Sequence, residues 1–121
     1  MSDDAWPNSL DALIAALRHH TLVLENDMVR VFETRIPAGD TVPVHTHQWP
    51  SIYCITSWSD FVRRNPQGNV LLDTRVAKSE GTSPTAFWSE PLPPHSLENV
   101  GTTEIRLVSI DLKQLARSTQ L

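Results

Sequence analysis

The chain has 121 residues, of which 40% are hydrophobic and 20% charged, a balance typical of one globular domain and not of a disordered segment. Ten lysines and arginines against 14 aspartates and glutamates give a net charge of -4. This charge disfavours a nucleic-acid or anionic-membrane partner, because either would need a basic surface. The single cysteine, Cys54, excludes an internal disulfide.

The N-terminal residues 1–4 carry no basic side chain and precede no apolar core, so they do not resemble a secretory signal. No apolar run approaches the roughly 20 residues that a membrane-spanning helix needs. We therefore expect a cytoplasmic protein.

The first predicted element is a helix over residues 8–20. It is indicated by apolar side chains at the i, i+3, i+4 and i+7 positions, namely Leu10, Leu13, Ile14 and Leu17. Asn8 or Ser9 is expected to cap the start of this helix, and Asp11 to place negative charge in its first turn.

His19 and His20 lie at the C-terminal end of this predicted helix. Neighbouring side chains on a helix point about 100° apart, which disfavours two ligands to one ion. Of the two interpretations, metal ligands or rings that favour positive charge at a helix C-terminus, we prefer the second.

From Thr21 onward, short β-branched and aromatic segments alternate with turn residues, which is typical of strands. The expected strands are 21–25, 28–36, 41–47, 51–57, 61–64, 70–73, 85–88, 95–100 and 104–112. Gly39 and Gly68 are expected in turns, residues 90–94 in an irregular segment, and residues 77–84 and 114–121 outside the sheets. The connections are too short for parallel crossovers, so the predicted fold class is all-β and mostly antiparallel, with one short N-terminal helix.

Three histidines form a candidate metal site. His45 and His47 lie two residues apart on a predicted strand, so both rings point to one face, about 6.6 Å apart along the chain. Two such rings can bind the same metal ion. His95, which follows two prolines, is the candidate third ligand.

These residues resemble the motifs of the cupin superfamily. Its first motif runs glycine, five residues, His-x-His and then a glutamate, and Gly39, His45 and His47 match its beginning. Its second motif closes with His-x-x-x-Asn, which His95 and Asn99 match.

The resemblance covers about residues 28–112. It implies a single cupin domain over residues 1–121, with an RmlC-like jelly-roll barrel (a double-stranded β-helix) and a divalent transition metal held by His45, His47 and His95. Iron, zinc, nickel and manganese are not distinguished, since imidazole suits several of these ions.

The sequence departs from the cupin pattern at the metal-binding glutamate, whose position is held by Ser51, or by Ile52 with the longer spacing. The second motif also lacks its glycine and its first proline, where Leu92 and Glu90 stand. Without the carboxylate, a metal bound by three neutral histidines forms a site that is more positive by one charge than the usual cupin site. Such a site favours a small anionic ligand.

Alternation on the strand 51–57 points Ser51, Tyr53 and Ile55 towards the interior. Ser51 and Tyr53 are therefore candidate substrate-pocket residues. Tyr53 either orients a substrate or donates a proton there, or it is a core tyrosine whose hydroxyl binds a backbone carbonyl. No catalytic residue is assigned.

Three functions fit these residues. The first is a metal-dependent enzyme, with a dioxygenase ahead of an isomerase or decarboxylase, since three-histidine iron sites occur in cupin-type dioxygenases. The second is a non-catalytic binding or sensing module for a small molecule, and the third is a metal-free barrel. We also expect a homodimer, because an open barrel leaves strand edges to be covered, with residues 21–36 as the candidate edge.

Overall fold

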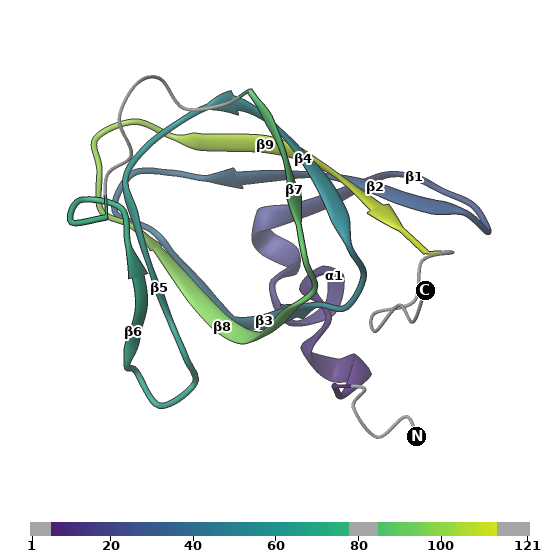
Figure 1. Ribbon diagram of the computed structural model, residues 1–121, viewed down its shortest axis with the longest axis horizontal. Helices are drawn as coiled ribbons and strands as arrows, with labels where there is room; N and C mark the ends of the chain where they lie inside the picture. The colour runs from purple at the N-terminus through teal and green to yellow at the C-terminus, as the bar shows by residue number, and fades with distance from the viewer. Residues whose placement is uncertain (1–5, 78–84, 114–121) are drawn as a thin grey trace.

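The computed structural model describes residues 6–77 and 85–113. Two antiparallel sheets face each other and enclose the interior of an open barrel (Figure 1). One sheet has five strands in the order β1-β2-β9-β4-β7, and the other has four in the order β3-β8-β5-β6. The strands are β1 (His20–Glu25), β2 (Val29–Ile36), β3 (Thr41–His47), β4 (Ser51–Ser57), β5 (Phe61–Arg64), β6 (Val70–Asp73), β7 (Ala86–Ser89), β8 (Leu92–Asn99) and β9 (Ile105–Leu112).

This architecture confirms the predicted all-β fold class, and the bounds of β3 to β6 are those expected from the sequence. Gly39 and Gly68 both have the positive φ that their turns require, at 84° and 91°. The predicted loop 77–84, except Ala77, and the predicted tail 114–121 lie outside the described residues.

The prediction that residues 90–94 are irregular is wrong from Leu92 onward, because β8 begins there and includes Pro93 and Pro94. Proline lacks the N–H that a central strand would need. On one side, β8 pairs with β5 only from Ser96 to Asn99. On the other side, the register with β3 shifts between the pairs His45–His95 and His47–Leu92. The two prolines therefore lie where few ladder hydrogen bonds are lost.

The single helix predicted over residues 8–20 is also wrong. The segment consists of three short pieces, η2 (Asn8–Leu10), α1 (Ala12–Ala15) and η3 (Leu17–His19). Asp11 is extended, at φ -55° and ψ 142°, and caps α1 by accepting a 3.0 Å hydrogen bond from the Leu13 N–H. The break reorients the segment, so that Ala12 and Ala16 are buried whereas Ile14 and Leu17 are 62% and 64% exposed.

The apolar core lies between the two sheets, beside the N-terminal segment. It consists of Ala16, Ile36, Val42 and Ile105, with Phe61, Leu97 and Leu107 packed against them. Along β2 burial alternates, which points Phe32, Thr34 and Ile36 into the interior. Among the described residues, no helix has the length and apolar character needed to cross a membrane.

Asn99 joins several turns at one end of the barrel. Its side chain is fully buried and donates hydrogen bonds to the carbonyls of Ile36 (2.9 Å) and Thr103 (2.8 Å). Its Oδ1 accepts from the Ser59 hydroxyl and the Gly101 N–H. This asparagine therefore satisfies buried backbone groups from distant parts of the chain, which is a structural role.

Candidate metal centre

The two sequence motifs meet through the pairing of β3 with β8. At one end, the Gly39 N–H donates a 3.0 Å hydrogen bond to the Asn99 carbonyl. Further along, His45 and His95 are direct cross-strand partners, and their ring centroids lie 4.4 Å apart. Opposed residues of an antiparallel pair project from the same face, so the ladder places both rings in the interior.

His47 lies on the same side of β3 as His45, as the alternation predicted. The Nε2 atoms of His45 and His47 are 3.1 Å apart. Two nitrogens at that separation, each ~2.1 Å from one ion, would subtend about 95° at it, an angle between adjacent ligands of a metal. The rings of His47 and His95 have centroids 5.6 Å apart.

A fourth histidine enters from the other sheet. His20 is the first residue of β1, is 2% exposed, and offers a ligand atom within 4.8 Å of those of His45 and His47. His95 is not part of this three-nitrogen group, although its ring lies against those of His45 and His47.

The prediction that His20 is a cationic ring at a helix C-terminus is therefore wrong. It failed because η3 ends at His19 and the chain becomes extended at His20, which turns the two rings apart. His19 Nε2 instead lies 2.9 Å from an oxygen of Asp40. The one sequence signal for His20 was its position directly before a predicted strand.

Backbone carbonyls orient three of the four rings. The Nδ1 atoms of His45 and His95 lie 2.7 Å from the carbonyls of Pro43 and Pro93, and that of His20 lies 2.9 Å from the carbonyl of Ala16. A carbonyl can only accept, so each Nδ1 carries the proton and each Nε2 keeps its lone pair. Such hydrogen bonds are the usual way in which metal-binding histidines are held.

All four rings are neutral at physiological pH. Burial, the largest cause, lowers the pKa of His20 to about 4 and that of His95 to about 3, and it also lowers the pKa of His45 and His47. The histidines also disfavour one another's charge. Neutral imidazole is the form that binds metal, so the site needs no deprotonation before it accepts an ion.

Phe32 supports the cluster from β2. Its ring is fully buried, lies almost parallel to that of His47 at 5.9 Å, and contacts the edge of His20 at 5.4 Å. Phe32 thus packs against the rings of both His20 and His47 and restricts their movement.

Ser51, the residue at the position of the family's glutamate, is 1% exposed and donates a 2.6 Å hydrogen bond to Asp111. Asp111 also accepts from Arg30, whose other nitrogens bind both oxygens of Asp11. Burial tends to lower the pKa of Arg30, but the hydrogen bonds and charges of Asp11 and Asp111 outweigh it and raise that pKa. Ser51 thus belongs to a buried ionic network and is not among the residues that line the pocket.

This ionic network also helps to position His20, because Asp11 lies in the N-terminal segment that ends at this residue. Asp11 is also the cap of α1, so the Arg30–Asp11 pair holds the segment that leads to His20 against the barrel. The carboxylate that a cupin site usually presents to the metal is absent at residue 51, and the structure supplies His20 at the cluster.

A cavity of about 90 Å³ extends from the histidines through the barrel interior. This is room for several waters or one small organic molecule. Apolar and aromatic side chains form most of its wall, and Tyr53 and Ile55 line it, as alternation along β4 predicted. Burial raises the pKa of Tyr53 to about 12, partly offset by a hydrogen bond with Ser89, so its hydroxyl stays protonated.

Comparison with solved structures supports the fold. A cupin domain from Bordetella pertussis matches with a TM-score of 0.61 and 22% identity, over 78% of this chain and 91% of that one. A double-stranded β-helix protein from Klebsiella pneumoniae matches at 0.55 and 17%, over 78% and 75%. An RmlC-like cupin family protein from Methanocaldococcus jannaschii matches at 0.53 and 10%, over 77% of each chain.

No family model and no curated protein matches the chain. At identities of 22% or less, the structural matches show the fold alone. The two partial histidine motifs lie on β3 and β8 of this fold. The chain therefore has the cupin fold, the double-stranded β-helix of the RmlC-like proteins, as its motifs predicted.

Proposed function

We propose that this protein binds a divalent transition-metal ion through His20, His45, His47 and His95 and uses it to hold a small anionic molecule. The observation that carries the proposal is the 3.1 Å separation of the His45 and His47 Nε2 atoms. At this distance the Nε2–H of a neutral His47 can donate to the Nε2 lone pair of His45, and a divalent ion can take the place of that proton. The backbone carbonyls that hold the Nδ1 protons of the other rings support the same interpretation.

Between the activities that such a site supports, we place a metal-dependent dioxygenase first. A divalent ion held here would supply Lewis acidity to a chelating ligand and, as iron, a centre for dioxygen chemistry. Tyr53 would orient the bound molecule as a neutral hydrogen-bond donor. The apolar wall would exclude water from that molecule.

A non-catalytic binding or sensing module is the second candidate. It is favoured by the absence of Asp and Glu from the described residues that line the pocket. With the four histidines assigned to the metal, only Tyr53 remains there as a general acid, and no carboxylate base is at hand.

The metal claim is tested by elemental analysis of protein purified without a nickel column. Wild type is expected to carry close to one equivalent of iron, zinc, nickel or manganese, and His47→Ala well below that. His19→Ala is the matched control, since His19 is buried but binds Asp40 outside the cluster. A wild type with almost no metal, or equal metal in all three proteins, would refute the proposal.

Enzyme and binding module are separated by oxygen consumption. The iron-loaded protein is screened against β-diketones, thiols and catechols, which present anionic chelating groups. Uptake that His47→Ala abolishes supports the dioxygenase, and no uptake with any of them supports the binding module.

We also propose that two copies of the chain pair through β1. This strand is an edge of the five-stranded sheet and exposes Leu22, Val23 and Leu24. An exposed apolar edge of this kind favours association. Light scattering at micromolar concentration is expected to give the mass of a dimer, and Val23→Lys that of a monomer; a monomeric wild type contradicts the proposal.

A further inference from the structure

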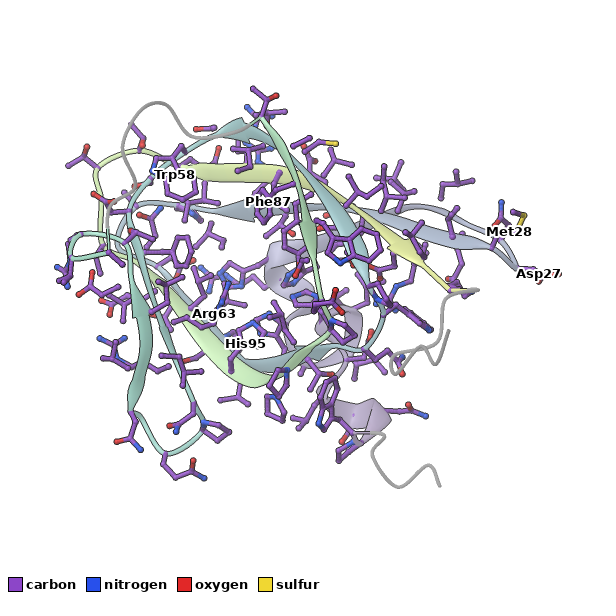
Figure 2. All side chains as sticks on the ribbon, viewed as in Figure 1. Asp27, Met28, Trp58, Arg63, Phe87 and His95 are labelled. Atoms are coloured by element: carbon purple, nitrogen blue, oxygen red, sulfur yellow. The ribbon has the colours of Figure 1, made fainter. Side chains whose placement is uncertain are left out.

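The pocket contains one charged side chain that the metal site does not use. Arg63 lies on β5, beside the stretch of β8 that carries His95, and is paired with Leu97. Figure 2 shows Arg63 and His95 pointing from these neighbouring strands into the space between the two sheets. The guanidinium carbon lies 5.7 Å from the centre of the Phe61 ring, which holds the side chain along the wall.

Arg63 differs from the other arginines of the described residues, each of which forms an ion pair with a carboxylate. Its Nε is buried and has no hydrogen-bond partner in the described part of the chain. The contrast with Arg30 is direct. Asp11 and Asp111 raise the pKa of Arg30, whereas burial lowers that of Arg63 and no carboxylate opposes the effect.

Arg63 is half-buried, and a charge held partly out of water without a carboxylate beside it is unfavourable, so such a group is retained where something else supplies the partner. Among the described residues that line the pocket, none is acidic. The positive charge of Arg63 also acts on the cluster, since it contributes to the low pKa of both His45 and His95. The pocket is therefore electropositive even before a metal is considered.

A second unpaired polar group lies in the same cavity. Ser109, on β9, is 1% exposed, lines the pocket, and has an Oγ without a hydrogen-bond partner among the described residues. It is the cross-strand partner of Tyr53. Arg63 from one sheet and Ser109 from the other thus bring buried polar atoms without partners to the wall of a cavity that, apart from the histidines, Thr34 and Tyr53, is apolar.

We propose that Arg63 is the specificity-determining residue of this pocket and pairs with the carboxylate of a small, largely apolar or aromatic monocarboxylic acid. The planar guanidinium matches a carboxylate through two parallel hydrogen bonds. A phosphate would need more donors than one arginine and one serine supply. The aromatic and aliphatic wall fits the rest of such an acid.

This inference deepens the proposed function by naming the class of ligand. It rests on that function in one respect only, namely that a second donor group of the ligand would bind the metal. The pairing with Arg63 itself needs no metal. It is therefore tested on metal-free protein, where failure of the metal site and failure of this inference give different results.

The experiment is calorimetric titration of metal-free protein at pH 7.5 with benzoate, cyclohexanecarboxylate and 3-phenylpropanoate, each beside its neutral amide. At least one carboxylate is expected to bind with a dissociation constant below about 1 mM, and its amide about tenfold more weakly or worse. Arg63→Met, which keeps the length of the side chain, is expected to lose this preference, and Arg63→Lys to retain part of it.

Arg64→Met is the matched control, because the next residue of β5 points to the other face and pairs with Glu98. It is expected to bind the carboxylates as wild type does. The comparison of acid with amide in wild type keeps the test valid even where Arg63→Met fails to fold. The inference is overturned if no carboxylate binds with a dissociation constant below about 1 mM, if acid and amide bind equally, or if Arg64→Met weakens binding as much as Arg63→Met.

Discussion

Ser51 Oγ donates a 2.6 Å hydrogen bond to Oδ1 of Asp111, and the two residues face each other across the β4–β9 ladder. Burial raises the pKa of Asp111, and the hydrogen bonds from Ser51 and Arg30 act against that rise. A glutamate at residue 51 would place a further carboxylate beside this one. The serine that stands where the cupin motif has a glutamate is thus linked to a buried ionic network of Arg30, Asp11 and Asp111.

Removal of the Ser51 hydroxyl is expected to destabilise the protein. Ser51→Ala leaves a buried oxygen of Asp111 without one of its donors, which costs about 1–3 kcal/mol in the free energy of unfolding. Thr56→Val is the control on the same strand, because its exposed hydroxyl binds only the carbonyl of Arg106. It is expected to change stability by less than about 1 kcal/mol. Urea denaturation measures both, and equal losses would argue against the role given to Asp111.

His20 and His19 are neighbours in sequence with opposite expected roles. His20→Ala removes a ligand from the cluster, so the affinity for Zn²⁺ or Co²⁺ is expected to fall about a hundredfold or more. His19→Ala removes only the contact with Asp40 and is expected to leave the affinity within about threefold of wild type. Equilibrium dialysis measures both constants, and an unchanged affinity in His20→Ala would remove this residue from the site.

The buried histidines predict that metal-free protein loses stability as the pH falls. Their folded-state pKa values lie below the ordinary 6.5, at about 4 for His20 and about 3 for His95. Below pH 6.5 the unfolded chain therefore binds more protons than the folded one. The stabilisation is complete above pH 6.5 and is lost progressively as the pH falls towards those folded-state values.

Between pH 7.5 and 5.0 the expected loss is about 2 kcal/mol for one independent proton, and the coupled cluster titrates as a unit. Urea denaturation at each pH measures it. His20→Gln combined with His95→Gln is expected to flatten the dependence in this range; Asp111, whose pKa burial raises, is present in both proteins and cancels in the comparison. A slope equal to that of wild type would contradict the assignment of neutral buried rings.

Gly101 is required by close packing rather than by its backbone angles. A Cβ there would overlap the Ser59 hydroxyl and lie 2.9 Å from the backbone nitrogen of Asp60, which cannot move without disturbing the turn. Gly101→Ala is therefore expected to lower the free energy of unfolding by about 1–3 kcal/mol.

Gly39→Ala is the comparison for Gly101→Ala. Residue 39 has open space around its Cα but a φ of 84°, so its cost is expected to be conformational, about 1 kcal/mol. Relief of the Gly101→Ala defect by Ser59→Gly is expected to be partial, because the contact with Asp60 remains. Thermal unfolding ranks these variants, and a neutral Gly101→Ala would show that the turn adapts.

Local pattern was enough to predict most of the barrel. Alternation and turn residues predicted the strands, and the interior direction of Tyr53 and Ile55 followed from it. The spacing of His45 and His47 on one strand predicted that their rings converge, because a strand repeats every two residues. The prediction of one N-terminal helix failed because it, too, used only the local pattern. The spacing of the apolar residues does not show that Asp11 binds Arg30, which lies 19 residues further along the chain.

Tertiary structure alone brings together groups that are far apart in the chain. His20 reaches His45 and His47 through the packing of β1 and its sheet against β3. Ser51 meets Asp111 across 60 residues, and Arg63 stands unpaired beside His95. None of these contacts produces a recognisable pattern in the sequence. They depend on which strands become neighbours and on which charges remain without a partner when the two sheets pack together.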